Sequence, residues 1–234
     1  MGVETEEQGT KKHLWTLYDV RWDFTTNLCG SVPADENMVK AWIDARKPKV
    51  QPPSGKSIEE VQTEVLEHLA LPEEDLEQKS MLTFQRNNGN LVLRAGTIRA
   101  HMKDCARVLS SLFVGKVKGE RSLAVRIVNG CYVDESTYWI PIQRPDGTLV
   151  SEQDGYKDKA VHAQGPRGPQ NCLKRFAFVN PASAEFTIKV LGSCIPETDL
   201  HHLFRYGGVH GYGGERGDGE GKYVYKLTKK GFED

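Results

Sequence analysis

The hydrophobic and polar positions along the chain predict a mixture of strands and helices. Residues 14–24 (LWTLYDVRWDF) are rich in aromatic and β-branched side chains, which predicts a long first strand. Residues 81–86 and 90–94 flank Asn-Asn-Gly, a strong signal for the turn of a β-hairpin. Residues 97–113 then predict the clearest helix, with Gly96 and Thr97 at its cap. Its apolar residues recur at intervals of four and three, on one face: Ile98, Met102, Cys105, Leu109 and Leu112.

The second half of the chain predicts more strands and one more helix. Strand-like sequences occupy residues 122–133, 138–142, 148–150, 174–180, 185–191 and 222–227. Two of them, 138–142 and 148–150, flank Pro145-Asp-Gly and predict a hairpin. Residues 197–206 predict a helix that ends at Gly207 and Gly208. Between these elements, residues 151–172 are polar with Gly and Pro spaced throughout, and they predict a long irregular or mobile loop.

Residues 25–80 have a different character, because turn-forming segments alternate there with two predicted helices. The first covers residues 38–46 and stops before Pro48. The second is acidic and covers residues 57–69, opened by a capping box of Ser57 and Glu60. We interpret this region as a helical insertion between the first strand and the predicted hairpin.

Composition narrows the class of protein. Hydrophobic residues make up 38% of the 234 positions and include four tryptophans, enough for a folded core. The apolar runs are too short to cross a membrane, and the polar N-terminus lacks the apolar region of a signal peptide. The five cysteines are scattered, with no Cys-x-x-Cys pair. This usage fits a reducing compartment, so we expect a cytoplasmic protein without a disulfide framework.

The formal net charge of −1 hides an uneven distribution. Residues 1–93 carry 10 basic and 16 acidic side chains, whereas residues 94–121 carry seven basic and two acidic ones. On the predicted helix, Arg99, Lys103 and Arg107 recur every four residues and lie along one side. This local excess could steer a polyanion, or it could pair with the acidic N-terminal third. A solvated helix face is the third alternative.

The most unusual segment is glycine-rich, with eight glycines between Gly207 and Gly221. It follows a helix and precedes a strand, the reverse of the dinucleotide-binding fingerprint, and it contains no P-loop Gly-Lys-Ser/Thr. Backbone N–H groups in such a loop can form an anion-binding nest, and a plain surface loop is the alternative. Its three acids, Glu215, Asp218 and Glu220, would repel a phosphate unless they point away or pair with cations.

Three segments resemble the RAMP superfamily of CRISPR-associated RNA-binding proteins. GYGGERGDGEGKYVY (residues 211–225) resembles the glycine-rich loop that this family carries between its last helix and last strand. LVLRAGTIRAHMKDCARVL (91–109) resembles its entry into a basic first helix, and FVNPASAEFTIKVL (178–191) begins a similar closing strand–helix–strand. The resemblance is best over residues 90–115 and 176–227. It implies an α+β fold with a ferredoxin-like (RRM-like) core, an antiparallel sheet with helices on one face.

The resemblance also implies where RNA would be bound. Contacts are implied for the backbone of six loop glycines: Gly211, Gly213, Gly214, Gly217, Gly219 and Gly221. Side-chain contacts are implied for Arg216 and Lys222 of the loop and for Arg99, Lys103 and Arg107 of the helix. From the local excess of positive charge, we also expect Arg94, Lys116 and Lys118 to bind RNA. Arg167 lies at the centre of residues 162–172 (HAQGPRGPQNC), where the resemblance implies a thumb that inserts into an RNA duplex or a neighbouring subunit. Such phosphate contacts give affinity without reading sequence.

We therefore expect one domain over residues 1–234, with insertions at about 25–80 (helical) and 134–172 (a hairpin and a mobile thumb-like loop). The expected function is that of an RNA-binding backbone subunit of a CRISPR or CRISPR-like ribonucleoprotein. Its partners would be a guide RNA, further copies of the same chain along the RNA and other effector subunits, with no membrane contact. One alternative is an endoribonuclease on the same fold. Another is a non-catalytic assembly protein, of phage or host, that uses the fold for protein–protein contacts.

We expect no cofactor, no metal and no catalytic residue. For the endoribonuclease alternative, the candidate acid–base groups are His13, His101 and His162, or the carboxylates of Asp19, Asp23 and Asp35. His201, His202 and His210 could in principle hold a metal ion, but adjacent residues of a helix point about 100° apart. The spacing of these residues singles out none of them.

Overall fold

A computed structural model describes residues 13–33, 81–112, 122–134, 138–165 and 168–233. Its larger sheet has seven strands, and every pairing within it is antiparallel. The order is β12-β1-β11-β8-β6-β5, and β7 also pairs with β11. The strands are β1 (Trp15–Phe24), β5 (Gln85–Asn87), β6 (Asn90–Arg94), β7 (Cys131–Val133), β8 (Trp139–Gln143), β11 (Ser183–Leu191) and β12 (Tyr223–Glu233).

A ferredoxin-like arrangement forms the heart of this sheet. Four strands lie in the order β12-β1-β11-β7. The helices α3 (Ala95–Leu112) and α4 (Leu123–Gly130) come between β1 and β7 in the sequence, and α5 (Glu197–His210) comes between β11 and β12. This is the βαββαβ pattern of ferredoxin-like folds. The α+β class with its antiparallel sheet is confirmed.

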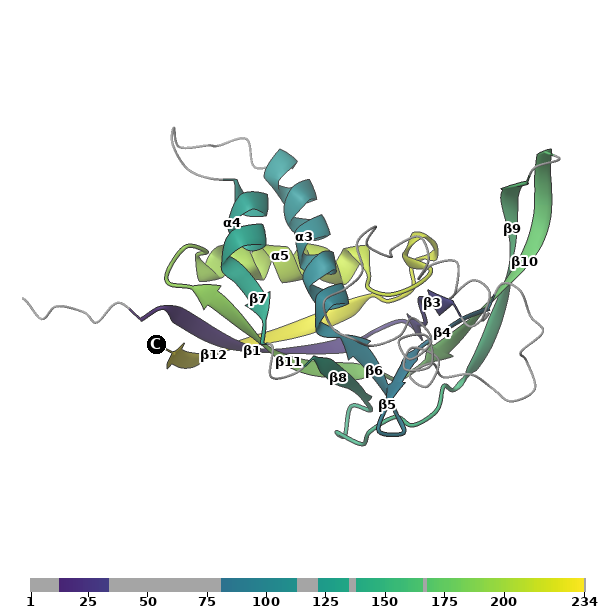
Figure 1. Ribbon diagram of the computed structural model, residues 1–234, viewed down its shortest axis with the longest axis horizontal. Helices are drawn as coiled ribbons and strands as arrows, with labels where there is room; N and C mark the ends of the chain where they lie inside the picture. Colours follow the sequence, from purple (N-terminus) through teal and green to yellow (C-terminus); the bar gives the residue numbers. More distant parts are fainter. Residues whose placement is uncertain (1–12, 34–80, 113–121, 135–137, 166–167, 234) are drawn as a thin grey trace, which may run out of the picture.

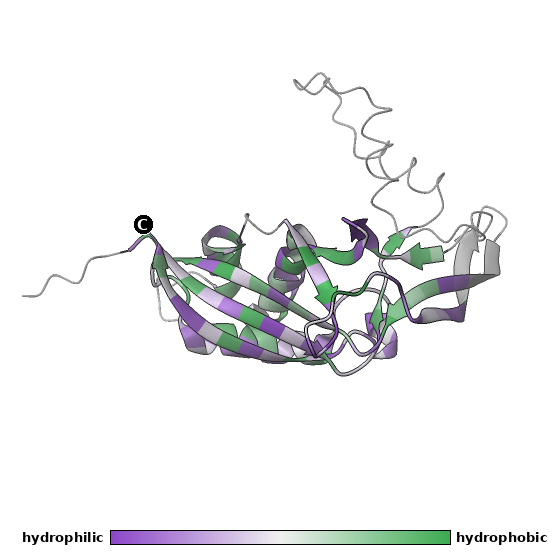
Figure 2. Ribbon diagram, turned by 90° about the horizontal axis from the view of Figure 1, so that it is seen from below, coloured by the Kyte–Doolittle hydropathy of each residue, from purple (hydrophilic) through white to green (hydrophobic). Residues whose placement is uncertain are grey.

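The three helices cover one face of the sheet (Figure 1). β1 shows why, because its burial alternates along the strand: every second side chain from Thr16 to Phe24 is buried, and the others are not. Successive side chains of a strand point to opposite faces, so the apolar set faces the helices. Figure 2 shows the same alternation as changing colour along the strands. Trp22 is fully buried at the centre of this core and stacks on Tyr223 with ring centroids 4.4 Å apart.

A second sheet lies beside the first and carries a long hairpin. Its strands run in the order β2-β10-β4-β3, with β9 paired to β10. The bounds are β2 (Leu28–Cys29), β3 (Val32–Pro33), β4 (Met81–Thr83), β9 (Gly155–Gly165) and β10 (Gly168–Val179). The β9–β10 hairpin projects away from the helices, at the end of the molecule opposite the C-terminus (Figure 1).

The expectation of a strand over residues 122–133 is wrong for most of its length. Residues 123–130 form α4, and only Cys131–Val133 forms a strand, β7. Ser122 caps the helix by accepting a hydrogen bond from the N–H of Val125. Leu123 and Ile127, four residues apart, are buried. The β-branched content favoured a strand, but the cap and the single apolar face stabilise a helix.

The expectation of an irregular loop over residues 151–172 is also wrong. β9 and β10 pair in continuous register from Gly155 opposite Phe178 to Gly165 opposite Gly168. A hairpin of this length is stabilised by backbone hydrogen bonds, which its polar side chains do not reveal. The glycines and prolines that suggested an irregular loop lie mostly towards its tip.

Two helix boundaries differ from the prediction. α3 begins at Ala95, so Gly96 and Thr97 lie in its first turn, where the hydroxyl of Thr97 donates to the carbonyl of Arg94 at 2.8 Å. α5 continues to His210, so Gly207 and Gly208 lie within it. A Cβ at Gly208 would lie 2.3 Å from the carbonyl oxygen of Tyr223 in β12. Glycine there allows the helix to approach the strand rather than ending the helix.

Other predicted elements agree with the structure or lie outside it. The turn at Asn-Asn-Gly is confirmed as β5–β6, but the expected strand at residues 81–86 is divided, because residues 81–83 form β4 of the second sheet. Residues 143 and 149 pair around the turn at Pro145. The predicted helices at 38–46 and 57–69 lie outside the described residues, whereas residues 25–33 contain β2 and β3. No helix in the described part of the chain is long and apolar enough to span a membrane.

Candidate nucleic-acid interface

The glycine-rich loop is packed against the rest of the protein. It leaves α5 at Gly211, which caps the helix with φ 82°, and returns to the sheet at Tyr223. A hydrogen bond of 2.8 Å from the N–H of Tyr212 to the carbonyl of Gly221 closes its neck. The loop is also joined to residues 26–30, because Gly214 donates to Cys29 and Gly221 donates to Asn27. It is therefore an ordered element of the fold.

These internal bonds limit which loop N–H groups can meet a ligand. The N–H groups of Gly211, Gly214, Gly219 and Gly221 all donate to carbonyl groups of the protein itself. Among the described residues, the N–H groups of Gly213 and Gly217 have no such acceptor. Of the six glycines expected to contact RNA through their backbone, these two are the better placed.

The three acidic side chains of the loop all pair with lysines of the β9–β10 hairpin. Glu215 accepts from Lys174 at 2.5 Å and from Lys159 at 3.1 Å. Asp218 pairs with the same Lys159 at 2.5 Å. Burial alone would raise the pKa of Glu215, whose side chain is only 6% exposed, but the two lysines outweigh burial and hold that pKa below its usual range.

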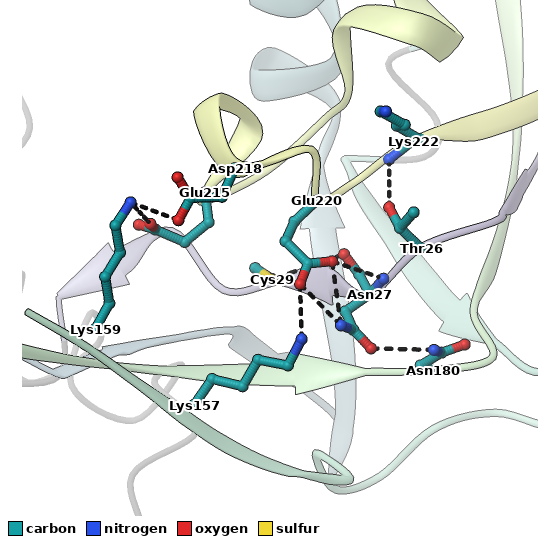
Figure 3. Close-up of polar contacts among 10 residues, drawn as sticks. All are labelled: Thr26, Asn27, Cys29, Lys157, Lys159, Asn180, Glu215, Asp218, Glu220 and Lys222. Carbon is teal, nitrogen blue, oxygen red and sulfur yellow. Dashed lines mark hydrogen bonds and ion pairs between the residues drawn. The ribbon is translucent and has the colours of Figure 1, made fainter.

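Glu220 joins the loop to both the hairpin and the segment between β1 and β2. Its carboxylate accepts from Lys157 at 2.7 Å, and from the backbone N–H and side-chain amide of Asn27 at 3.0 and 2.9 Å. Burial raises the pKa of Glu220, but the hydrogen bonds from Lys157 and Asn27 bring it below its usual value. Figure 3 shows these carboxylates turned towards the hairpin strands. The acids therefore pair with cations, the condition under which they would not repel a phosphate.

The two basic side chains of the loop remain exposed. The guanidinium of Arg216 lies 3.1 Å from Nε2 of His210. Partial burial and the charge of Arg216 lower the pKa of His210, so His210 is held in the neutral form that can accept from the guanidinium. Lys222 donates through its backbone N–H to the hydroxyl of Thr26 at 2.9 Å, and its side chain is exposed. Arg216 and Lys222 are thus available to an anion in solution.

The basic stripe of α3, which we define as Arg99, Lys103 and Arg107, divides into two parts. The guanidinium of Arg99 stacks over the ring of Tyr132 at 4.1 Å from its centroid and donates to the carbonyl of Val128 at 2.9 Å. Arg99 therefore packs α3 against α4 and β7. Arg107 is 70% exposed and only loosely paired with Asp104, at 3.4 Å, and Lys103 is half-buried. Lys103 and Arg107 remain candidates for phosphate contact, whereas Arg99 has a structural role.

Arg94 lies at the end of β6, where α3 begins. It donates to the hydroxyl of Tyr138 at 2.5 Å and lies over the same ring, 5.5 Å from its centroid. A cavity of about 200 Å³ opens between this residue, Thr97 and the Tyr212–Gly213 end of the glycine loop. Lys116 and Lys118 lie outside the described residues, as does Arg167.

Two candidate catalytic histidines with described side chains, His13 and His101, contact different aromatic residues. His101 is buried, 3.0 Å from the hydroxyl of Tyr223, and burial, with smaller effects of His210 and Arg216, lowers its pKa to about 3. The ring of His13 stacks on Phe232 at 4.9 Å, and His201 contacts the hydroxyl of Tyr225 at 3.0 Å. Within the part of the chain that the structure describes, no three His, Cys, Asp or Glu side chains are placed to hold a metal ion.

The open face of the sheet is charged and largely paired with itself. Arg21 on β1 contacts Asp23 at 2.8 Å and Glu185 on β11 at 2.7 Å. Lys230 on β12 approaches Asp19 at 3.4 Å. RRM domains stack bases on aromatic side chains of this face. The outward positions of β1 from Asp19 to Asp23 are charged instead, so the glycine loop and α3 are the better candidates for an RNA surface.

Sequence reasoning missed the hairpin lysines Lys157, Lys159 and Lys174. The available signal was the Lys-Asp-Lys sequence at residues 157–159, which places two cations on one face of a strand. That signal is meaningful only if the segment is a strand, and its composition predicted a loop.

Comparison with known proteins gives a distant structural likeness. No protein-family model matches the chain, and no curated protein is similar to it in sequence. A chain of the type III-B Cmr-beta complex bound to cognate target RNA, determined by cryo-electron microscopy, is similar with a TM-score of 0.39 and 9% sequence identity. The likeness covers 92% of this chain but 61% of that one, so this chain spans about three fifths of its length. At this identity and TM-score the likeness establishes neither a family nor a function.

Proposed function

We propose that this protein is an RNA-binding subunit of a CRISPR or CRISPR-like ribonucleoprotein, and that it holds RNA through its phosphates. The observation that carries the proposal is the state of the glycine-rich loop. Its three carboxylates face the hairpin lysines, while its two cations, Arg216 and Lys222, remain exposed. Because its carboxylates are paired within the protein and its cations are exposed, this loop can bind a polyanion such as RNA.

The position of the loop supports the same proposal. It connects the last helix and last strand of a ferredoxin-like core, as does the loop of the RAMP superfamily that its sequence resembles. The N–H groups of Gly213 and Gly217 and the side chain of Arg107 on α3 would add contacts that read no base sequence. When RNA is held by its phosphates, its bases stay free to pair, as a guide RNA requires. Assembly of several copies along one RNA, beside other effector subunits, is part of the proposal.

RNA binding by charge-reversal variants tests the proposal. We expect the wild-type protein to bind single-stranded RNA in fluorescence anisotropy, with an affinity that falls steeply as salt is raised. Arg216→Glu and Lys222→Glu should each weaken binding roughly tenfold, because each replaces an attraction by a repulsion. Together they should reduce the slope of log affinity against log salt by about 1.4, since each phosphate contact to single-stranded RNA contributes about 0.7.

Lys226→Glu is the matched control, because it makes the same charge change on the open face of the sheet, where Lys226 is exposed opposite Arg21. It should leave affinity within about twofold of the wild type, as expected for a rim or remote charge under screening. If the wild-type protein binds no RNA at low salt, or if Lys226→Glu weakens binding as much as Arg216→Glu, the proposal is wrong. RNA that is cut during the assay would favour an endoribonuclease instead.

A further inference from the structure

The β9–β10 hairpin places three lysines on one face. Lys159 and Lys174 are directly opposite each other in the antiparallel register, and Lys157 lies two residues from Lys159 on the same strand. Opposed residues share a face of the hairpin, as do residues two apart. We call Lys157, Lys159 and Lys174 the hairpin lysine cluster. Like charges directly opposite one another are unfavourable, so this arrangement requires an anion.

The opposite face of the same hairpin provides a comparison. There Asp158 and Arg175 are opposed in register and form an ion pair of 2.7 Å. That face is neutralised within the hairpin itself. The lysine face has no carboxylate of its own among its described residues, and its counter-anions come from the glycine loop, about 40 to 60 residues further along the chain.

The anions on the lysine cluster are the loop carboxylates. Glu215 contacts both Lys159 and Lys174, Asp218 contacts Lys159, and Glu220 contacts Lys157. Glu215 adopts a left-handed backbone conformation, with φ 54°, that a non-glycine residue rarely takes. The ion pairs therefore hold this carboxylate in place against an unfavourable backbone preference.

The lysines remain accessible to an anion from solution. Their side chains are 43%, 36% and 30% exposed for Lys157, Lys159 and Lys174. A carboxylate and a phosphate both present oxygens that an ammonium group binds through charge-assisted hydrogen bonds. The exposed cations Arg216 and Lys222 lie on the same loop as the competing acids, so an RNA strand held by them would lie close to the cluster.

We propose that the hairpin lysine cluster is a second phosphate-binding site for RNA, and that Glu215 and Asp218 occupy it in the RNA-free protein. Binding of RNA then exchanges loop carboxylates for phosphates on Lys159 and Lys174, while Glu220 stays paired with Lys157. The inference rests on the proposed RNA-binding function. It adds that the carboxylates of Glu215 and Asp218 compete with RNA phosphates for the hairpin lysine cluster. No bond is made or broken in this exchange other than hydrogen bonds and ion pairs.

Removing the competing carboxylate tests the proposal. In the full chain, Glu215→Gln should bind single-stranded RNA at least about threefold more tightly than the wild type, because the binding-competent state no longer has to be released from an internal anion. Asp158→Asn is the matched control: it removes one negative charge from the same hairpin on the opposite face, where Arg175 is its partner. Asp158→Asn should change affinity less than about twofold.

Removing the cations gives the complementary result. Lys159→Gln with Lys174→Gln should weaken RNA binding about tenfold and reduce the salt slope by about 1.4, as expected for two lost phosphate contacts. The control Arg175→Gln should leave the slope unchanged. Thermal melting of each variant shows that it is folded. If Glu215→Gln does not fold, Asp218→Asn replaces it, since the Asp218 carboxylate is 47% exposed and contacts one lysine of the cluster, Lys159.

The outcomes separate this inference from the proposed function. If no variant and no wild-type protein binds RNA at low salt, the proposed function fails and the inference with it. If the wild type binds RNA but folded Glu215→Gln binds no better than Asp158→Asn, the carboxylates only fasten the hairpin and the inference is overturned. Unchanged affinity in the double lysine variant also overturns it. Tighter binding by Glu215→Gln together with weaker binding by the double lysine variant supports it.

Discussion

Replacing Gly221 by alanine tests whether the glycine-rich loop is a packed part of the fold. Gly221 has φ 70°, in the left-handed region, and a Cβ there would lie 1.9 Å from the carbonyl oxygen of Tyr212. That oxygen belongs to the backbone and cannot rotate away as a side chain can. Hydrogen bonds between Tyr212 and Gly221 and from Gly221 to Asn27 fix the chain on both sides of the clash.

The expected loss of stability is the sum of two costs, one for the left-handed backbone conformation and one for the clash of the new methyl group. A left-handed backbone costs a non-glycine residue about 1–2 kcal/mol. Forcing a methyl group into an occupied space costs roughly 1–3 kcal/mol. Their sum, about 2–5 kcal/mol, is a large part of the 5–15 kcal/mol that stabilises typical domains. For a chain of this length, each kcal/mol lowers the melting temperature by about 2–4 °C, so Gly221→Ala should melt about 4–20 °C below the wild type.

Circular dichroism at 222 nm during heating measures this difference directly. Gly217→Ala is the matched control, because it makes the same substitution in the same loop, where no heavy atom lies within 4 Å of the new Cβ. Gly217→Ala should melt at or slightly above the wild-type temperature, since alanine restricts the unfolded chain more than glycine does. Equal melting temperatures for Gly221→Ala and Gly217→Ala would refute the reasoning, and the loop would then be a tolerant linker.

Two further predictions concern residues of α3. His101 stays neutral in the folded state down to about pH 3, whereas it gains a proton near pH 6.5 when unfolded. The unfolded state therefore binds more protons between these values, so the free energy of unfolding should fall by up to about 1.4 kcal/mol per unit as the pH drops from 6.5 to 5. Urea titrations should show a smaller pH dependence in His101→Gln, and an equal one would contradict the assignment. Arg99→Ala should lose about 1–3 kcal/mol of stability through its contacts with Tyr132 and Val128, against under about 0.5 for the exposed Arg107→Ala. The same urea titrations compare these two variants. Equal losses would mean that the contacts of Arg99 stabilise the fold no more than those of the exposed Arg107.

Gly208 and Gly221 lie where the backbones of two segments of the protein pack closely together. Gly221 meets the carbonyl of Tyr212, and Gly208 in α5 meets the carbonyl of Tyr223. Both glycines allow two segments of the protein to approach each other, so neither is needed to bring a ligand close to the backbone. In the proposed RNA-binding function, the loop would therefore contribute its charged side chains and the N–H groups of Gly213 and Gly217, not these two glycines. Its acids contact the hairpin, and its bases remain at the surface.

The sequence by itself determined the elements whose signals are local. The apolar spacing from Ile98 to Leu109 fixed one face of α3, and that face is buried. Asn-Asn-Gly specified the β5–β6 turn, where Asn88 and Gly89 both have positive φ. Each of these features depends on residues within a few positions of one another, so the pattern along the chain contains it.

Only the tertiary structure decided features that depend on distant partners. The β9–β10 hairpin is held by backbone pairing, which no side-chain pattern records, and its polar sequence therefore suggested a loop. The spacing of Arg99 placed it with the exposed cations of α3, but its guanidinium stacks on Tyr132 and donates to the carbonyl of Val128. Glu215 lies 41 residues from Lys174 in the sequence, and only the fold brings their charges together. Ion pairs and strand pairing act through space, so the chain alone left open which charges were paired and which remained exposed.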